Sequence, residues 1–380
     1  MTTGTAMSAP ARAAAGTALA IEAHDLAKTY LKGVKALDGL SFAVPAGTVF
    51  GLLGPNGAGK STTVKILTTL AQADSGTARV AGLDVRAKPA RVRHLIGVVA
   101  QLSGADPVAT GRENMMLSGR IQGLRGRDLA RRTDELLGRF GLADAAGRQV
   151  RTYSGGMRRR LDVAMGLINR PQVLFLDEPT AGLDPESRSA MWAEIGRLAA
   201  AEGLTILLTT HYLEEADHLA SRLAIVDRGR VVVAGTPDEL KGELHGDAVH
   251  LELASGTAGD HALTALAPVA GVREARVEGT SLSARADDGA AALPGVLAAL
   301  ARVPGVRAAR IEGTSLSARA DKGATALPAV LTALEGAGVT VRAATVARPS
   351  LDDVYLRYSG RRFTEADQSP ATPATSGGAR

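Results

Sequence analysis

The chain has 380 residues, 45 % of them hydrophobic, so it is long enough for two packed domains. It has no cysteine, which excludes disulfides, thiolate metal sites and cysteine nucleophiles. Its formal charge of +5 could suggest nucleic acid, but only 3 % of the residues are aromatic and the basic residues form no long block. We therefore expect no nucleic-acid partner, and we interpret the densest basic run, Arg158–Arg160, as a solvated or nucleotide-facing helix surface.

Four regions follow one another along the chain. Residues 1–20 are rich in Ala, Thr and Gly and are expected to form a flexible tail, not a signal peptide. Residues 21–247 alternate short apolar runs with amphipathic stretches, which predicts an α/β domain with a largely parallel sheet. Residues 248–362 predict a smaller α+β domain, and residues 363–380, rich in Thr, Ser, Pro and Gly, predict disorder. No run of about 18 apolar residues occurs, so any membrane connection is expected to come through a partner.

The predicted elements of the first domain are short and alternate in type. In chain order they are a strand (Thr48–Leu53), a helix (Lys60–Leu70), a strand (Ile96–Ala100), a mostly helical stretch (Thr110–Leu167), a strand (Val173–Asp177), a helix (Glu186–Ala201), a strand (Thr205–Thr210), a helix (Glu214–Ala220), a hairpin (Leu223–Asp227 and Arg230–Ala234) and a helix after Pro237.

A glycine-rich loop joins the first of these strands to the first helix. It fits the phosphate-loop pattern G-x-x-x-x-G-K-[ST] and consists of Gly54, Pro55, Asn56, Gly57, Ala58, Gly59, Lys60 and Ser61, with Thr62 next in the helix. The glycines let backbone N–H groups surround phosphate oxygens, and the helix N-terminus adds partial positive charge. Lys60 is expected to contact the β- and γ-phosphates, and Ser61 to ligate Mg²⁺. A structural glycine-rich turn is the alternative, but the flanking strand and helix favour phosphate binding.

Two carboxylates end the buried strand Val173–Asp177, at the edge where open α/β sheets bind ligands. Asp177 is expected to hold Mg²⁺ through water, and Glu178 to orient and deprotonate an attacking water. Helix capping before Pro179 would explain these acids if no phosphate loop were present. A second anion site is predicted where Ser154, Gly155 and Gly156 open a helix.

These motifs together resemble the nucleotide-binding subunits of ABC transporters, in the order phosphate loop, Gln101, Ser-Gly-Gly signature, acidic strand and His211. The resemblance covers about residues 21–247 and implies a P-loop NTPase of ABC type with a helical subdomain. It also implies an ATPase with ATP and Mg²⁺ as cofactors, located at the cytoplasmic face of the cell membrane through an integral-membrane permease subunit. Two copies would form a head-to-tail dimer, in which ATP on one phosphate loop is capped by the other chain's signature residues.

Individual roles follow from the same resemblance. Tyr30 would stack on adenine, Gln101 would sense Mg²⁺ and the membrane partner, Asp184 would link the two sites, and His211 would contact the γ-phosphate. Taken alone, Tyr30 is an ordinary half-buried strand residue, Gln101 a surface amide and His211 a satisfied histidine.

Two signature positions depart from most of the family: Tyr153 replaces Leu, and Met157 replaces Gln, whose amide hydrogen bonds methionine cannot make. The run Tyr153–Asp162 and the segment Pro349–Leu356 resemble the drug-export branch typified by daunorubicin-resistance ATP-binding proteins. We therefore expect an exporter subunit for a drug- or antibiotic-like molecule. Export of a lipid or polysaccharide, a non-transport ABC ATPase and an ATP-binding protein without hydrolysis remain the alternatives.

The second domain contains a near-verbatim repeat, in which residues 277–300 recur as residues 311–334. In each copy small and apolar residues first alternate with polar ones, as in a strand, and leucines then recur at helical spacing. We interpret the repeat as a tandem duplication that lengthened an accessory sheet. No residue in it has a catalytic arrangement.

Overall fold

The computed structural model describes residues 18–244, 247–253, 273–278, 281–286, 306–312, 315–320, 341–347 and 349–360. Two compact units are present, Met1–Pro237 with Tyr355–Arg380, and Asp238–Val354. The first strand begins at Leu19, inside the tail predicted for residues 1–20, and the tail predicted for residues 363–380 lies outside the described residues. The domain boundaries drawn from the sequence stay predictions.

A six-stranded sheet forms the centre of the first unit. Its strands, in spatial order, are β10 (Arg230–Gly235), β9 (Arg222–Asp227), β3 (Val49–Leu53), β8 (Thr205–Thr210), β7 (Val173–Asp177) and β6 (Ile96–Val99). All neighbours are parallel except β10 and β9, which form the predicted hairpin. Every residue of β3 and β8 is buried, as expected for a parallel sheet covered on both faces. The predicted parallel α/β fold is confirmed.

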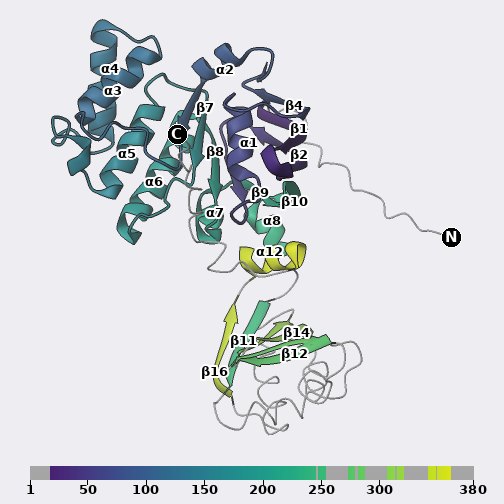
Figure 1. The fold of residues 1–380 in the computed structure, drawn as a ribbon. Helices are drawn as coiled ribbons and strands as arrows, with labels where there is room; N and C mark the ends of the chain where they lie inside the picture. Colours follow the sequence, from purple (N-terminus) through teal and green to yellow (C-terminus); the bar gives the residue numbers. More distant parts are fainter. Residues whose placement is uncertain are drawn as a thin grey trace, which may run out of the picture. The chain divides into compact units, whose positions relative to one another are not determined.

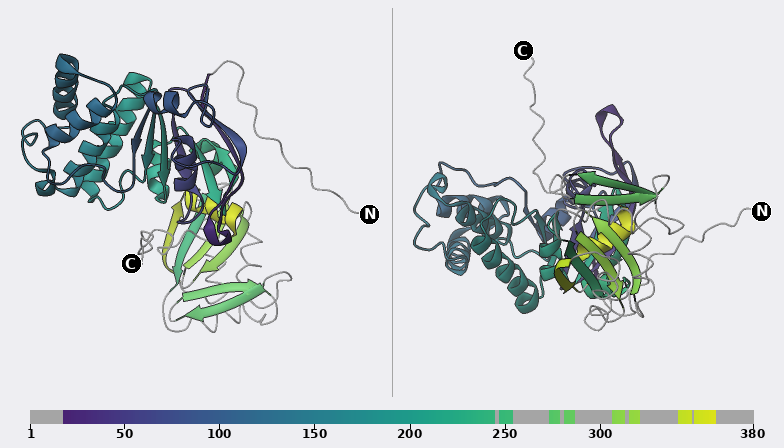
Figure 2. Two further views of the ribbon diagram at one scale, coloured as in Figure 1. Left: turned by 45° about the horizontal axis from the view of Figure 1, so that its top comes forward. Right: turned by 90° about the horizontal axis from the view of Figure 1, so that it is seen from below.

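Helices cover the sheet and form a separate end of the unit. They are α1 (Lys60–Leu67), α2 (Pro89–Leu95), α3 (Gly111–Ile121), α4 (Gly126–Arg139), α5 (Gly155–Gly166), α6 (Pro185–Glu202) and α7 (Leu213–Leu219); α8 (Pro237–Gly242) follows at the boundary between the two units. The helical stretch predicted from Thr110 onward is thus three helices, the first opened by a capping box between Thr110 and Glu113. Within this unit, Figures 1 and 2 show α3 and α4 at one end of the parallel sheet, away from α1.

An antiparallel sheet lies at the other end of the unit (Figure 1) and was not predicted from the sequence. Its strands, in spatial order, are β2 (Lys35–Pro45), β1 (Leu19–Thr29), β4 (Ser75–Val80) and β5 (Leu83–Asp84). The pairing of β1 with β2 shifts register repeatedly, and Asp25 has a φ of 49°. Such irregularities interrupt the period-two alternation by which strands are predicted.

The core of the first unit consists of two apolar clusters, one on each face of the parallel sheet. Along β7, Leu174 and Leu176 belong to the cluster that includes α5 and α6, whereas Val173 and Phe175 belong to the cluster that includes α1 and the antiparallel strands. This alternation is that of a strand buried on both sides. The end of β7 is therefore held between two packed layers.

The second unit contains a six-stranded antiparallel sheet. Its strands, in spatial order, are β12 (Arg273–Glu278), β13 (Ser281–Ala286), β14 (Val306–Glu312), β15 (Ser315–Ala320), β11 (Asp247–Leu253) and β16 (Val341–Ala347). Strands β13 and β15 have the identical sequence SLSARA and belong to the two copies of the repeat. The helices predicted within the repeat lie outside the described residues. The last described helix is α12 (Leu351–Ser359).

We expect deletion of residues 278–311 to leave the protein folded and active. The hairpin β12–β13 pairs Val277 with Leu282, and the hairpin β14–β15 pairs Ile311 with Leu316 in the same register. The deletion would join β12 to the second copy at the equivalent residue, so that β12 can pair with β15, which keeps its partner β11. Thermal unfolding and ATP-dependent phosphate release will test this. An insoluble product, or one that binds ATP without hydrolysing it, would mean that the second copy is needed by the first unit.

Candidate active site

The phosphate loop lies between β3 and α1, as predicted. A Cβ at Gly54 would lie 2.2 Å from the carbonyl oxygen of Val226, so only glycine fits against β9. Gly59 has a φ of +108°, and a Cβ there would lie 2.5 Å from the carbonyl oxygen of Ala36. Gly57 is exposed and Asn56 half-buried, while the other loop residues up to Lys60 are buried. Both ends of the loop are thus packed against neighbouring backbone, and Gly57 at its tip is exposed to solvent.

Lys60 begins α1 and is buried, with 4 % of its surface exposed. Its Nζ donates hydrogen bonds to the carbonyl oxygens of Gly54, at 2.5 Å, and Pro55, at 3.1 Å. The ammonium group is therefore held across the loop, in the position from which it can meet phosphate oxygens. Ser61 and Thr62 follow on the helix and are half-buried.

The two acids at the end of β7, Asp177 and Glu178, lie beside the phosphate loop. Asp177 Oδ1 accepts hydrogen bonds from Ser61 Oγ, at 3.2 Å, and from Thr209 Oγ1, at 2.5 Å. Thr209, on β8, also accepts a hydrogen bond from the backbone N–H of Glu178 at 3.1 Å. One threonine thus fixes both acids, and this role was missed because sequence reasoning treated β8 only as a buried strand.

Glu178 stands at the centre of the site and is 7 % exposed. Its Oε2 accepts a hydrogen bond from Gln101 Nε2 at 3.0 Å, and its Oε1 lies 3.0 Å from His211 Nδ1 and 4.0 Å from Lys60 Nζ. Burial by itself would raise the pKa of Glu178, but the hydrogen bond from His211 and the positive charges of His211, Lys60 and Arg159 lower it below its ordinary value. The carboxylate is therefore ionised at neutral pH.

The backbone of Glu178 is in the left-handed region, with a φ of 50°. A bulky non-glycine residue adopts this conformation only where its surroundings impose it, and such strain is concentrated at functional sites. Here the backbone N–H of Glu178 is bonded to both the side chain and the carbonyl oxygen of Thr209. In this conformation the carboxylate contacts both Gln101 and His211.

His211 follows β8 and is 2 % exposed. Its Nε2 is buried and has no hydrogen-bond partner among the described residues, although its ring packs on Tyr212 with the centroids 4.2 Å apart. Buried polar groups are normally bonded, so an unsatisfied one indicates a place for a ligand atom. The unsatisfied nitrogen favours contact with a ligand over the role of an ordinary satisfied histidine, and the role of His211 stays a prediction.

The signature residues begin α5 at a surface of the first unit. Ser154 caps the helix by accepting a hydrogen bond from the backbone N–H of Met157 at 3.2 Å, and both Ser154 and Gly155 are exposed. Gly156 is buried, and a Cβ there would lie 2.6 Å from Ser187 Oγ. The helix N-terminus is thus available to an anion brought from outside.

The two departures in the signature have structural explanations. Tyr153 is buried, and its hydroxyl donates a hydrogen bond to the carbonyl oxygen of Ala145 at 2.7 Å. The Tyr153 hydroxyl lies directly against Gly111: a Cβ on residue 111 would be only 2.3 Å from it. Met157 is partly buried and packs against the apolar cluster of α5 and α6. Both residues thus anchor the signature turn to the helical end of the unit.

Tyr30 and Asp184 make only local contacts among those that the structure shows for them. Tyr30 is 40 % exposed, and Lys28 Nζ lies 5.7 Å from its ring centroid. Asp184 caps α6 by accepting a hydrogen bond from the backbone N–H of Ser187 at 2.9 Å, and this bond is the main cause that lowers the pKa of Asp184. Neither role inferred from the resemblance is tested by these contacts.

Arg159 was not recognised as part of the site. Within the run Arg158–Arg160, Arg158 is exposed and Arg160 half-buried, but Arg159 is only 7 % exposed. The interpretation of the whole run as a solvated or nucleotide-facing surface is therefore wrong for Arg159. Helical periodicity could have placed one of the three arginines inward, but it could not have identified what that residue contacts.

A second buried acid, Glu215, contacts the segment that follows Glu178. Glu215 Oε1 accepts hydrogen bonds from Thr180 Oγ1, at 2.7 Å, and Trp192 Nε1, at 3.2 Å. Burial raises the pKa of Glu215, and these hydrogen bonds only partly offset the effect. Glu215 therefore ties the segment after Glu178 to α6 and α7.

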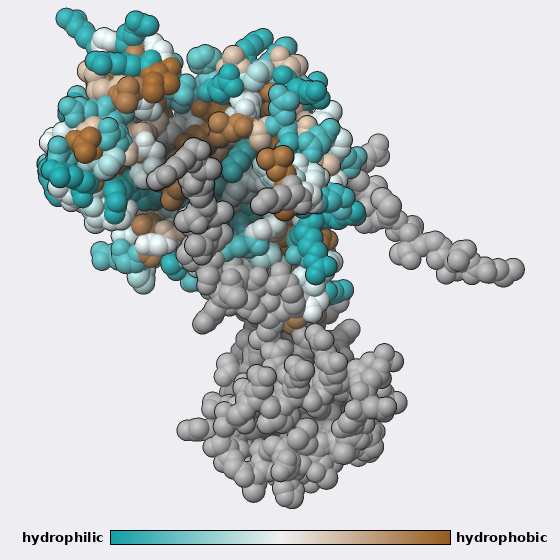
Figure 3. Space-filling view, in the orientation of Figure 1, coloured by the Kyte–Doolittle hydropathy of each residue, from teal (hydrophilic) through white to brown (hydrophobic). Residues whose placement is uncertain are grey.

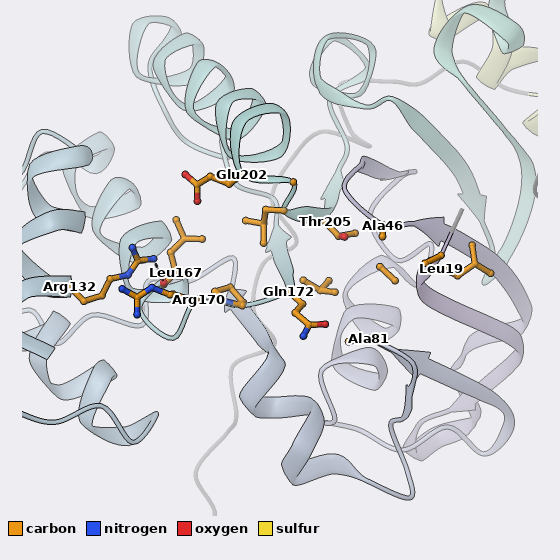
Figure 4. Close-up of a pocket in the computed structure, with 15 residues that line it drawn as sticks. Leu19, Ala46, Ala81, Arg132, Leu167, Arg170, Gln172, Glu202 and Thr205 are labelled. Carbon is orange, nitrogen blue, oxygen red and sulfur yellow. Dashed lines mark hydrogen bonds between the residues drawn. The ribbon is translucent and has the colours of Figure 1, made fainter. Parts of the chain in front are cut away.

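A cavity of about 640 Å³ opens at the opposite end of the parallel strands (Figure 4). Its lining includes Val173 and Thr205, the first residues of β7 and β8, and Figure 4 shows Arg132 and Arg170 side by side at one end of it. None of the predicted site residues lines it. The candidate site is therefore the set of residues at the carboxyl ends of the strands, where open α/β sheets bind ligands.

The residues present fit a nucleotide with a divalent cation. The loop offers backbone donors and a buried ammonium group, and His211 Nε2 offers an unsatisfied buried atom. Ser61 and Asp177 bring a hydroxyl and a carboxylate oxygen within 3.2 Å of each other, the hard oxygen ligands that Mg²⁺ prefers. In the part of the chain that the structure describes, no group of three or more His, Asp or Glu could hold a metal alone, so phosphate oxygens and water would complete the shell.

Comparison with known proteins agrees with this geometry. A family model described as ABC transporter matches residues 37–181. The chain is 49 % identical over 270 residues to the daunorubicin/doxorubicin resistance ATP-binding protein DrrA of Streptomyces peucetius, covering 71 % of this chain and 81 % of the relative. It is 43 % identical over 353 residues to the daunorubicin resistance ATP-binding protein DrrA2 of Streptomyces coeruleorubidus, covering 93 % and 98 %. Among solved structures, cbiO1 from Clostridium perfringens, part of the ABC transporter complex cbiONQ, matches with a TM-score of 0.54 and 27 % identity, covering 60 % of this chain and 92 % of that chain.

Proposed function

The chain belongs to the ATP-binding subunits of ABC transporters, in their daunorubicin-resistance branch, and from that premise we propose that it powers efflux of a drug-like small molecule through a separate membrane subunit. It is an ATPase that binds ATP. The resemblance stated from the signature and closing segments is thereby confirmed at the level of the family.

One observation carries the hydrolytic part of the proposal: an ionised, buried Glu178 between Gln101 and His211, beside the phosphate loop. A carboxylate in this setting can accept a proton from water and orient it for attack on the terminal phosphate. Lys60 and the loop N–H groups would bind the phosphates, and His211 Nε2 would donate to the γ-phosphate. These groups are fixed before substrate arrives, so little reorganisation is needed in the transition state.

We further propose that Mg²⁺ binds with the nucleotide. Ser61 would ligate the ion directly, Asp177 would hold it through water, and Gln101 would supply a further amide oxygen. Bound there, the cation would neutralise charge on the phosphates. The hydrogen bonds of Asp177 with Ser61 and Thr209 support this arrangement, because they orient the carboxylate toward the loop.

A second copy of the chain is the partner that the signature residues fit. Ser154 and Gly155 are exposed at a helix N-terminus, which can accept the terminal phosphate of a nucleotide bound to another chain. We propose a head-to-tail dimer in which Ser154, Gly155 and Gly156 cap the partner's ATP and Asp184 links the two sites. Tyr30, exposed beside the first strand, would stack on the adenine.

The membrane subunit needs a docking surface, and exposed apolar side chains provide a candidate. Leu102, next to Gln101, is 81 % exposed, and Leu117 and Ile121 on α3 are 55 % and 73 % exposed. Figure 3 shows hydrophobic side chains at the surface over the helical end of this unit. No helix among the described residues is long and apolar enough to span a bilayer. We propose that the chain is peripheral, at the cytoplasmic face of the membrane, through this contact.

Transport itself is tested with inside-out vesicles. We expect the chain to remain on salt-washed vesicles only when they contain the membrane protein that copurifies with it. Those vesicles should accumulate a fluorescent anthracycline with ATP and not with ADP. If the vesicles took up a lipid or a saccharide but no drug, the proposed substrate class would be wrong, and the transported molecule would be that lipid or saccharide. Retention of the chain by vesicles without any partner, after washing in high salt, would contradict the peripheral location.

A further inference from the structure

Arg159 makes four hydrogen bonds, all to backbone carbonyl oxygens. Its Nη1 donates to Ala100 at 2.6 Å and its Nε to Pro179 at 2.8 Å. Its Nη2 donates to Asp177, at 2.9 Å, and to Glu178, at 3.0 Å. One buried guanidinium from α5 therefore holds the residue before Gln101 and three consecutive carbonyls around Glu178.

Asp162 lies three residues farther along the same helix and is 6 % exposed. Its Oδ1 accepts hydrogen bonds from Ser103 Oγ, at 2.9 Å, and from the backbone N–H of Gly104, at 3.1 Å. Arg159 and Asp162 thus hold the loop of residues 100–104 at both ends, with Gln101 between them. Residues three apart on a helix share a face, which explains how one helix reaches both ends.

The geometry requires arginine in particular. Converging carbonyl oxygens in a buried place need several donors in a fixed plane, which a guanidinium provides and an ammonium group does not. The strained backbone of Glu178, with its φ of 50°, depends on such surroundings to persist. Without the guanidinium, the buried carbonyls would lose their shared donor and the segment would relax.

We propose that Arg159, supported by Asp162, is a positioning residue that ties the signature helix to Glu178 and Gln101. This inference rests on the proposed function, because it assigns a role in the hydrolytic step. Movement of α5, which carries the signature residues, would then be transmitted directly to the carboxylate that activates water. This link lies within one chain. It does not need the glutamine that most of the family has at the position of Met157.

The test compares Arg159→Ala and Arg159→Lys with Arg91→Ala, a control that removes an exposed arginine on α2, away from the site. We expect Arg159→Ala to lower kcat about 100-fold, the cost of a displacement of about 1 Å at the reacting groups, while KM for ATP changes little. Arg159→Lys should recover only part of kcat, and Arg91→Ala should keep the wild-type rate. Added guanidinium ion should restore part of the activity of Arg159→Ala, and not of Glu178→Gln.

Two results would overturn the inference. One is a wild-type kcat in Arg159→Ala while Glu178→Gln is inactive, which leaves the proposed function intact. The other is a fall in the kcat of Arg159→Ala that guanidinium does not restore, together with loss of the ATP-induced rise in melting temperature. That result would mean that Arg159 is needed for folding in general. Absence of ATP hydrolysis in the wild-type chain itself would instead contradict the proposed function.

Asp162→Ala provides a second, independent variant. It leaves every hydrogen bond of Arg159 to the carbonyls in place but frees Ser103 and Gly104. We expect a smaller loss of kcat than in Arg159→Ala, with Asp162→Asn closer to the wild type because its amide oxygen can still accept. Equal, wild-type rates in both Asp162 variants would remove Asp162 from the proposal.

Discussion

Glu178→Gln should abolish ATP hydrolysis and leave ATP binding intact. Glutamine keeps the size of the side chain and an oxygen that can accept from Gln101, but it cannot take a proton from water. General-base catalysis typically contributes about 100- to 10,000-fold, so the steady-state rate should fall by at least about 100-fold. Because the phosphate loop and Lys60 are unchanged, the affinity for ATP should stay within about threefold of the wild type.

Phosphate release measures the rate, and titration with a fluorescent ATP analogue measures the affinity. In light scattering, the variant should accumulate as a dimer when ATP is present, since the bound nucleotide is no longer consumed. Glu214→Gln is the matched control, because Glu214 is exposed on α7. Hydrolysis by Glu178→Gln at the wild-type rate would contradict the assignment of the base.

The pH dependence of the rate offers a check on the same residue. Its positively charged neighbours lower the pKa of Glu178 despite burial, so its folded-state pKa lies below that of the unfolded chain. The ionised form, and the stability it contributes, are therefore fully present at neutral pH and are lost only as the pH falls through the lowered pKa. A loss of activity near neutrality would thus have to come from another group.

The parts of the site that the sequence predicted are local ones. The phosphate loop and the acids after β7 depend on residues that are adjacent in the chain and on a strand whose apolar run is plain. The parallel sheet then brings them together, because the carboxyl ends of β3, β7 and β8 share one edge. Short-range pattern and one topological rule were sufficient for these residues.

The residues that were missed act across long sequence separations. Arg159 reaches Ala100, 59 residues away, and Thr209 reaches Asp177, 32 residues away. A run of basic residues, or a strand that contains threonines, does not indicate a hydrogen-bond partner that is so far away in the sequence. The exposed–buried–half-buried order of Arg158, Arg159 and Arg160 is set by how α5 packs, and that packing depends on the whole unit.

The antiparallel strands and Tyr153 show a different limit. β1 is long enough to be predicted, but its bulges break the alternation on which the prediction depends. Tyr153 was read only as a departure from the usual leucine. In the structure its hydroxyl donates a hydrogen bond to the carbonyl oxygen of Ala145, and its ring packs beside Gly111. The more polar residue therefore fixes the start of the signature helix.

Lys60→Ala should abolish high-affinity ATP binding, the opposite outcome to Glu178→Gln. Nζ of Lys60 is buried across the phosphate loop, 2.5 Å from the carbonyl oxygen of Gly54, so its charge is poorly screened by solvent. Removing one partner of a buried, hydrogen-bonded charge pair costs about 2–5 kcal/mol, which corresponds to a loss of affinity of about 30- to 4,000-fold.

Titration with the fluorescent ATP analogue measures that loss, and the melting temperature without nucleotide reports whether the loop still folds. Lys65→Ala is the control, since Lys65 is exposed on the same helix and its loss should leave affinity unchanged. If Lys60→Ala bound ATP as tightly as the wild type, the phosphates would have to lie elsewhere. The roles of Glu178, Gln101 and His211 all assume that the phosphates lie at this loop, so these roles would then fail together.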